Sequence, residues 1–175
     1  MRWILFLPAS LFLLLFSGVL SHRAQAQDAS VPAEGLPWKP FEEAVALAAK
    51  QNKKVLVDIF APWCPWCRRL QREVYTDPAV QEYLKERFIV TRLNGDDTTA
   101  SYAFKTYNLT AAELAAGLGA QGYPTTVFLA ANSDYITRLP GFVDAAEFIH
   151  VLRFIGTEAY QKLTYQEYVA QQEKK

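Results

Sequence analysis

Two cysteines, Cys64 and Cys67, are the only cysteines in this 175-residue chain. A disulfide between them would close so short a loop that it would remove little chain entropy, which makes it a weak structural staple. A zinc site needs four ligands, and after residue 26 the chain has one histidine, His150. Thiol–disulfide exchange is the chemistry that this pair fits best, and we expect neither a metal nor a cofactor.

The position of the pair along the chain predicts different roles for the two sulfurs. An apolar run from Val55 to Phe60 predicts a buried strand, and a helix is expected to begin near Cys64. Free backbone N–H groups and the positive end of the helix dipole would lower the pKa of Cys64 and favour its thiolate. Cys67 would lie one turn deeper and be less exposed. Cys64 would therefore attack a substrate disulfide, and Cys67 would then attack Cys64 to release the product.

A carboxylate, Asp58, lies inside the apolar run that precedes the cysteines. If this side chain is buried, its pKa is raised and it can exchange a proton near neutral pH. If the strand lies at the edge of a sheet, the same side chain reaches water and has no chemical role. The residues alone leave both interpretations open.

Hydrophobic spacing and capping residues predict the elements that position this site. Two strands, 55–60 and 88–93, are expected around a helix over 77–87, and a further helix over 40–52 comes before them. Helical pieces are expected over 99–120, and a hairpin over 125–130 and 135–139. The last helices begin after Asp144 and Thr164. This order predicts an α/β fold with a central mixed sheet flanked by helices, and with a helical insertion before Pro124.

The N-terminus is typical of an export signal. Arg2 precedes an apolar run from Ile4 to Leu20, and Ala24-Gln25-Ala26 resembles a signal cleavage site. We expect residues 1–26 to be a cleaved signal peptide, residues 27–40 a lead-in segment and residues 41–175 one domain in the periplasm. An uncleaved membrane anchor is the alternative.

Charge argues against nucleic acid as a partner. The chain has 18 basic and 18 acidic residues. Cleavage after Ala26 would remove Arg2 and Arg23, leaving 16 basic residues against 18 acidic ones and a net charge of about −2. Nucleic-acid binding requires a basic surface.

Several segments together resemble the thioredoxin superfamily, in particular its exported bacterial members. The stretch from Val57 to Cys67 resembles the active-site strand and helix of that family, and Gly122-Tyr123-Pro124-Thr125 resembles its cis-proline loop. Arg92-Leu93-Asn94 is similar to the end of its middle strand, and Gly141 to the glycine after its hairpin. The resemblance covers roughly residues 55–155 and implies a thioredoxin fold.

The resemblance also implies roles for individual residues. Asp58 would transfer a proton to or from Cys67, and Arg92 would tune that carboxylate. Pro124 would be cis and would expose the backbone of Tyr123 for pairing with an extended substrate. Further substrate contacts are expected from three residues near the cysteines and the hairpin: Trp63, Trp66 and Gly141.

These observations predict a periplasmic thiol–disulfide oxidoreductase, acting as a reductase on disulfides of exported proteins. Such a reductase needs electrons from across the membrane, so a membrane thiol donor is the expected partner, and we expect a monomer. A disulfide oxidase or isomerase is the alternative within the same class. A non-catalytic peptide-binding or assembly module of the same fold is the alternative outside it.

Overall fold

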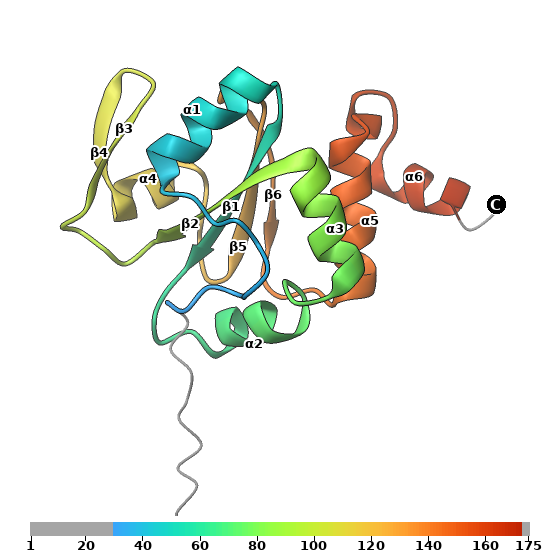
Figure 1. The fold of residues 1–175 in the computed structure, drawn as a ribbon, viewed down its shortest axis with the longest axis horizontal. Coiled ribbons are helices and arrows are strands. Elements are labelled where there is room, and N and C mark those ends of the chain that lie inside the picture. The colour runs from blue at the N-terminus through green and yellow to red at the C-terminus, as the bar shows by residue number, and fades with distance from the viewer. Residues whose placement is uncertain (1–29, 173–175) are drawn as a thin grey trace, which may run out of the picture.

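The computed structural model of the protein describes residues 30–172 (Figure 1). The expected signal peptide, residues 1–26, lies outside this range. A four-stranded sheet with the order β2-β1-β5-β6 forms the centre of the fold. Its strands are β1 (Lys54–Phe60), β2 (Phe88–Asn94), β5 (Thr125–Leu129) and β6 (Tyr135–Pro140). β1 pairs in parallel with β2 and antiparallel to β5, and β5 and β6 form the expected hairpin.

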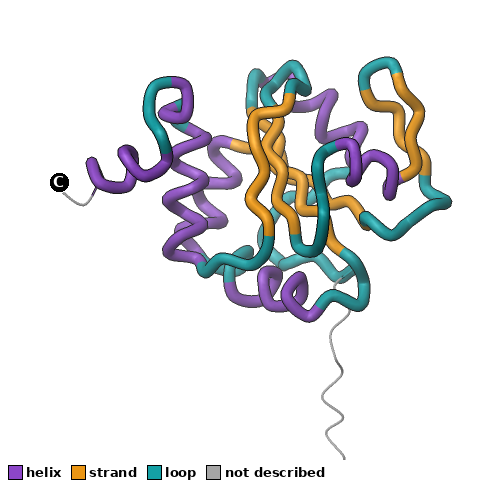
Figure 2. Tube along the Cα trace, turned by 180° about the vertical axis from the view of Figure 1, so that it is seen from behind, coloured by secondary structure: helices purple, strands orange, loops and turns teal. Residues whose placement is uncertain are grey.

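Helices cover both faces of this sheet (Figures 1 and 2). One face carries α1 (Phe41–Gln51) and α4 (Ala111–Gly117), and the other carries α3 (Pro78–Arg87) and α5 (Ala145–Gly156). α2 (Pro65–Glu73) begins just beyond the carboxyl end of β1. A short 3-10 turn (Ala159–Gln161) and α6 (Tyr165–Gln172) follow α5. The predicted α/β class, with a mixed sheet flanked by helices, is confirmed.

The strand β1 separates two hydrophobic clusters. Val55, Val57 and Ile59 pack with α1 and α4, whereas Leu56 packs with α3 and α5. Successive side chains of a strand point to opposite faces, so Asp58 projects to the same face as Leu56. Every residue of β1 beyond the first is buried, as predicted for a central strand.

The predicted helical insertion is wrong in its first half. Residues 101–110 form a hairpin of β3 (Ser101–Phe104) and β4 (Tyr107–Thr110), which stands apart from the main sheet (Figure 2). Tyr102 and Phe104 alternate with exposed residues, and both rings pack edge-on against Phe41, at centroid distances of 5.7 and 5.5 Å. An apolar side chain at every second position favours a strand over a helix.

The helical part of the insertion is α4, and it begins where the sequence predicts. Thr110 and Glu113 form a reciprocal capping box, in which each side chain accepts a hydrogen bond from the backbone of the other residue. Asp77 and Asp144 likewise cap α3 and α5 through backbone N–H groups in the first turn of each helix. The predicted helix starts are therefore confirmed.

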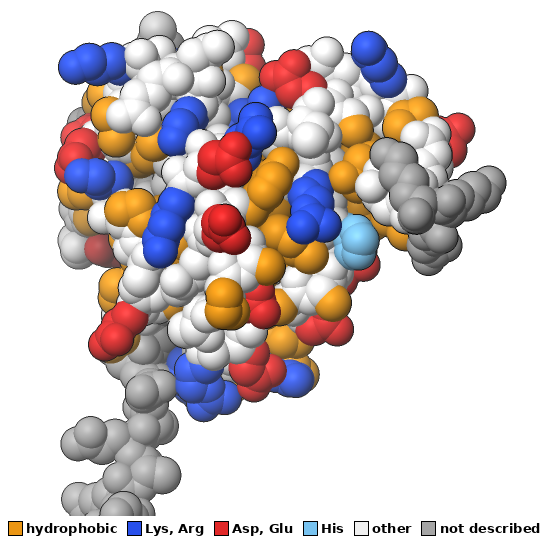
Figure 3. Space-filling model, turned by 45° about the vertical axis from the view of Figure 1, so that its right-hand side comes forward, with side chains coloured by type: hydrophobic (Ala, Val, Ile, Leu, Met, Phe, Trp, Pro, Cys, Tyr) orange, Lys and Arg blue, Asp and Glu red, His pale blue; other side chains and the backbone are white. Residues whose placement is uncertain are grey.

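The surface is mixed in charge. Lysine and arginine side chains are interspersed with aspartate and glutamate on the face that carries α3 and α5, and no large area of one sign is visible there (Figure 3). Within residues 30–172, no helix combines the length and the apolar character needed to cross a membrane.

Candidate active site

Cys64 and Cys67 form a disulfide at the first turn of α2, with their Cα atoms 5.3 Å apart. Cys64 is the N-cap residue, and its sulfur accepts a hydrogen bond from the backbone N–H of Cys67 at 3.0 Å. Pro65 occupies the first helical position, where a backbone N–H would have no helical partner. This N–H donor and the positive end of the helix dipole favour a thiolate on Cys64 once the disulfide is reduced.

Both cysteines are covered in the disulfide form. Cys64 is 2% exposed and Cys67 is 1% exposed, so the expected difference in exposure is negligible in this state. The pair forms a small cluster with Phe60 and Ala61, and Tyr123 packs against it. A substrate sulfur must therefore approach Cys64 through a small opening between the side chains that surround it.

Asp58 is fully buried, so the alternative in which this carboxylate reaches water is wrong. Its Oδ2 accepts hydrogen bonds from Gln71 Nε2 and from Arg92 Nε, each at 2.8 Å. Its Oδ1 accepts none from the described residues. Burial raises the pKa of Asp58, and the charge and hydrogen bond of Arg92 offset this only in part.

Gln71 connects Asp58 to the helix that carries the cysteines. It lies four positions after Cys67 in α2, so the two side chains share one face of that helix. Both are buried, at 6% and 1% exposure. Since Gln71 contacts Asp58 directly, the carboxylate lies beneath the same face of α2 that buries Cys67.

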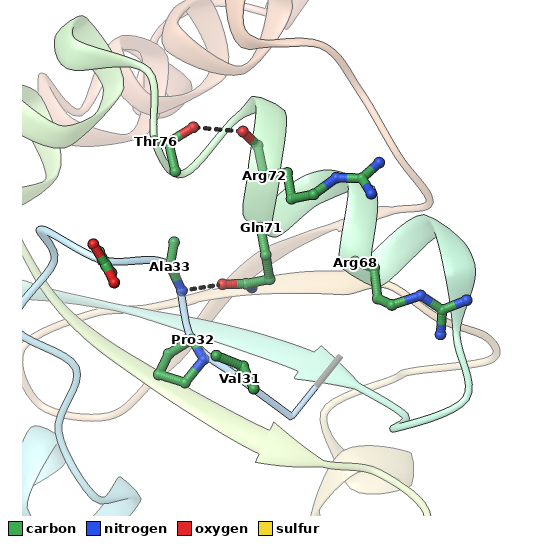
Figure 4. A pocket seen from close by; sticks show the side chains of 8 residues that line it. Val31, Pro32, Ala33, Arg68, Gln71, Arg72 and Thr76 are labelled. Atoms are coloured by element: carbon green, nitrogen blue, oxygen red, sulfur yellow. Dashed lines mark hydrogen bonds between the residues drawn. The ribbon is translucent and has the colours of Figure 1, made fainter. Parts of the chain in front are cut away.

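Residues 30–36, which we call the N-terminal strap, hold both hydrogen-bond donors to Asp58. The backbone N–H of Ala33 donates to Gln71 Oε1 at 2.7 Å (Figure 4). Arg92 Nη1 donates to the carbonyl of Ser30 at 2.8 Å. A pocket of about 230 Å³ lies between the strap and α2, lined by Val31, Pro32, Ala33, Glu34, Arg68, Gln71, Arg72 and Thr76. The strap is therefore hydrogen-bonded to both residues that donate to the buried Asp58 carboxylate.

The cis-proline loop and the hairpin form a groove close to the disulfide. The Tyr123–Pro124 peptide bond is cis, as the resemblance implies. Gly141 donates its N–H to the carbonyl of Pro124 at 2.8 Å, and its φ of 79° is one that glycine adopts without strain. The groove has a volume of about 380 Å³ and is lined by Trp66, Arg69, Tyr123, Pro124, Gly141 and Phe142. The structure thus brings four of the predicted substrate-contact residues to one groove.

The two tryptophans of the motif lie at the surface. Trp63 is 66% exposed and Trp66 is 52% exposed. Trp63 donates its indole N–H to Asp96, whereas the ring of Trp66 lies 5.7 Å from that of Phe142. The guanidinium of Arg69 lies over both of those rings, 5.5 Å from the centroid of Trp66 and 4.5 Å from that of Phe142.

Three residues of this region were not predicted: Gln71, Asp96 and Phe142. Asn94-Gly95-Asp96 is recognisable in the sequence only as the end of a strand, and Phe142 only as the residue after a glycine. Within residues 30–172 there is no group of three or more histidine, cysteine, aspartate or glutamate side chains that could hold a metal ion.

A disulfide at a helix N-terminus, a buried acid beneath that helix and a cis-proline loop beside it define a thiol–disulfide oxidoreductase of thioredoxin fold. A family model described as a thioredoxin-like domain matches residues 41–156. The chain belongs to this thioredoxin-like family.

Relatives with printed functions agree with this class. The chain is 31% identical over 108 residues to the thiol:disulfide interchange protein DsbD of Actinobacillus pleuropneumoniae, a match that covers 61% of this chain and 17% of that protein. It is 29% identical over 156 residues to DsbD of Pectobacterium atrosepticum, covering 81% of this chain and 25% of the relative. The chain therefore spans a quarter or less of the length of these two relatives.

Solved structures show the same fold. A thioredoxin from Thermus thermophilus superimposes with a TM-score of 0.57 at 31% identity, covering 69% of this chain and 87% of that one. A thioredoxin-fold protein from Helicobacter pylori gives a TM-score of 0.58 at 24% identity, covering 70% and 80%. The second likeness is one of fold alone.

Proposed function

We propose that this oxidoreductase works in the periplasm as a reductase, passing two electrons from Cys64 and Cys67 to disulfides of exported proteins. The observation that carries the proposal is the buried Asp58 beneath α2, one of whose oxygens accepts no hydrogen bond. A carboxylate with a raised pKa is a suitable base for the Cys67 thiol, which must lose its proton before it can attack.

The exchange proceeds in two steps. In the first, the Cys64 thiolate attacks one sulfur of the substrate disulfide, whose S–S bond breaks, and the other substrate sulfur leaves as a thiolate and takes a proton from water. In the second, Asp58 accepts the proton of Cys67, and the Cys67 sulfur attacks the Cys64 sulfur. The remaining substrate sulfur leaves and takes up the proton that Asp58 held. The substrate has gained two electrons and two protons, and the protein has become the disulfide described above.

The groove beside the disulfide supplies the contacts for a polypeptide substrate. Trp66, Tyr123, Pro124 and Gly141 line it, and the exposed ring of Trp63 lies near Tyr123, with a centroid distance of 6.0 Å. Aromatic side chains give a binding surface a large apolar area with few rotatable bonds. These residues are therefore our candidates for substrate binding, with Cys64, Cys67 and Asp58 as the catalytic set.

Location and partners belong to the same proposal. Residues 1–26 would be a cleaved signal peptide, residues 27–40 a lead-in and residues 41–175 the thioredoxin-like domain. A reductase outside the cytoplasm needs electrons delivered across the membrane, so the disulfide would be reduced again by a membrane thiol donor. The DsbD relatives, which are named thiol:disulfide interchange proteins, support thiols and disulfides of proteins as the partners.

The redox potential and a trapping variant test this function. We expect the protein, equilibrated with glutathione buffers, to have a potential more reducing than the glutathione couple, and a strongly oxidising potential would favour an oxidase or isomerase instead. Cys67→Ser should retain clients as mixed disulfides on Cys64, whereas Cys64→Ser should retain none. Undiminished biological activity of Cys64→Ser would point to the non-catalytic module.

A further inference from the structure

Asp96 joins two loops that flank the disulfide. One of its oxygens, Oδ2, accepts the indole N–H of Trp63 at 2.6 Å, and the other, Oδ1, accepts the hydroxyl of Tyr123 at 2.8 Å. Trp63 precedes the first cysteine, and Tyr123 precedes the cis-proline. We call Trp63, Asp96 and Tyr123 the aromatic clamp.

The backbone of Gly95, next to Asp96, lies so close to the Tyr123 ring that it leaves no room for a side chain. A Cβ atom added to Gly95 would lie 2.6 Å from both the hydroxyl oxygen and the Cε1 atom of Tyr123. That distance is shorter than real Cβ contacts, so a side chain at position 95 would displace the tyrosine ring. The chain therefore brings the backbone of Gly95 against Tyr123 and places the Asp96 carboxylate in reach of its hydroxyl.

The clamp fixes side chains that would otherwise be free to move. Trp63 is 66% exposed, and its own hydrogen bond to Asp96 and the edge-on contact with Tyr123 are what hold its ring. A side chain that is already ordered loses less conformational entropy when a partner binds. This advantage applies only to a partner large enough to touch the rings.

We propose that Asp96 is a specificity-determining residue, which holds Trp63 and Tyr123 in place so that the site favours disulfides within extended polypeptide segments over small disulfides. The inference rests on the proposed function and names the substrate class of that site. Tyr123 lines the groove of about 380 Å³ beside the disulfide. A segment lying there would place an apolar or aromatic side chain against the exposed Trp63 ring. A small disulfide offers only its sulfur atoms and a few methylene groups, and gains nothing from the clamp.

The test compares two substrates on each variant. The reduced full-length protein is assayed with insulin, a protein disulfide, and with hydroxyethyl disulfide, a small one. We expect Asp96→Ala to raise KM for insulin about three- to tenfold, the range for the net loss of one ordinary hydrogen bond, and to lower the ratio of insulin to hydroxyethyl disulfide turnover. Asp96→Asn, whose single carbonyl oxygen can accept from only one of the two donors with the original geometry, should lie between wild type and Asp96→Ala.

A double variant separates the clamp from a general effect on folding. Tyr123→Phe removes only the hydroxyl and should also raise KM for insulin, while the Asp96→Ala/Tyr123→Phe double variant should be no worse than Asp96→Ala alone. Asp134→Asn is the matched control. Asp134 is an exposed carboxylate in the turn between β5 and β6, at the far end of β5 from Pro124, and it forms an ion pair with Lys105. The Asp134→Asn variant should keep the wild-type ratio.

The possible failures differ. If Asp96→Ala and Tyr123→Phe both leave KM for insulin at the wild-type value, or lower turnover of the two substrates equally, the inference is overturned while the oxidoreductase function stands. If the wild-type protein reduces neither substrate, the proposed function fails and the inference falls with it.

Discussion

Two opposing effects act on the carboxylate of Asp58. Burial disfavours its charge, and the guanidinium of Arg92, at 2.8 Å, favours it. Burial is the larger effect, so the pKa of Asp58 is raised even though the group belongs to an ion pair. The acid is consequently a better proton acceptor for a thiol than an exposed aspartate would be.

Replacement of Asp58 tests its role as the base. We expect Asp58→Asn to slow release of a thiol from the mixed disulfide on Cys64 by roughly 10²-fold, the lower end of the effect of general bases. In the wild type this rate should rise as the pH passes through the raised pKa of Asp58, because only the deprotonated carboxylate accepts a proton. In Asp58→Asn that rise should be missing. Stopped-flow fluorescence of a labelled thiol gives the rate.

The first step of exchange provides the control for this variant. Attack by Cys64 does not use Asp58, so in a Cys67→Ser background Asp58→Asn should leave the rate of mixed-disulfide formation within about twofold of its value with Asp58 present, a change of less than 0.5 kcal/mol. An unchanged pH profile for release in Asp58→Asn would remove Asp58 from the mechanism.

The pKa of the Tyr123 hydroxyl reports on the aromatic clamp. Loss of solvation, followed by the hydrogen bond to Asp96 and its charge, raises the pKa of Tyr123 to about 12. The pKa of Tyr123 in the folded protein lies above the ordinary value of 10.0. The contribution of the protonated Tyr123 hydroxyl to the stability of the fold is therefore fully present below about pH 10 and is lost as the pH rises through about 12.

We therefore expect wild type to lose more stability than Tyr123→Phe between about pH 10 and pH 12, as measured by urea unfolding at several pH values. Asp96→Ala should lower the pKa of Tyr123, which can be followed as the difference in alkaline absorbance against Asp96→Ala/Tyr123→Phe. A Tyr123 pKa that is insensitive to Asp96 would show that the hydrogen bond is not formed in solution.

Individual residues differ in how far the sequence predicts their surroundings. The sequence predicts a disulfide-exchanging pair because the types and spacing of Cys64 and Cys67 are local features. The Asp96 contacts join residues 27 and 33 positions apart, and no short motif contains them. Whether Asp58 is buried also depends on the strands beside it, which is why the residues alone left that question open.

At the scale of elements, α2 and the N-terminal strap act together. Gln71 is the connection, because its amide bonds Asp58 on one side and the backbone of Ala33 on the other. Trp38 adds a further link by donating its indole N–H to the carbonyl of Ala33 at 3.0 Å. A segment outside the matched family domain therefore contributes to the environment of the buried acid.

Gln71→Leu tests this connection while keeping a side chain of similar size. We expect the free energy of unfolding to fall by about 1–3 kcal/mol, because the Ala33 N–H and the Asp58 carboxylate each lose a buried partner. The pKa of Asp58 should rise further, since the hydrogen bond from Gln71 lowers it. Urea unfolding gives the stability, and hydrogen exchange at the Ala33 amide shows whether the strap has loosened.

Gln161→Leu, at an exposed glutamine of the 3-10 turn, is the control and should change stability by no more than about 0.5 kcal/mol. If the Ala33 amide stays fully protected in Gln71→Leu, the strap is held by other contacts and the proposed connection is unimportant.

The elements themselves are largely predictable where a strong local signal exists. β1 is recognisable as a central strand from its continuous apolar run, and α3, α4 and α5 from the residues that cap them. The sequence does not predict the β3–β4 hairpin, because the alanines of residues 99–110 and the capping box that follows them favour a helix. The alternation of Tyr102 and Phe104 with smaller residues is the signal that would have revealed it.

At the scale of the whole molecule, the hydrophobic clusters that stabilise the fold are separate from the disulfide. The two large clusters lie on opposite faces of the sheet, and Cys64 and Cys67 belong to a third, small one. We therefore expect the fold to persist in both oxidation states of the site, as a protein that alternates between two redox states requires.

Reduction should accordingly leave the fold intact. We expect the reduced protein to lose about 2 kcal/mol or less in free energy of unfolding, the chain-entropy value for so short a loop. Urea unfolding of the oxidised and reduced forms measures the difference, and the Cys64→Ser/Cys67→Ser variant in oxidising buffer should behave like the reduced form. Loss of cooperative unfolding on reduction would contradict this separation.

The covered disulfide also affects how electrons can enter the oxidised protein. With Cys64 only 2% exposed, a thiol that merely diffuses past has almost no access to its sulfur, whereas a partner that docks in the groove can carry a thiol to it. We expect small thiols to reduce the oxidised site much more slowly than a docked protein thiol does. Docking would then decide which proteins exchange electrons with this site, and few electrons would pass to small solutes. A second oxidoreductase with different docking partners could therefore work in the same compartment without exchanging electrons with this one.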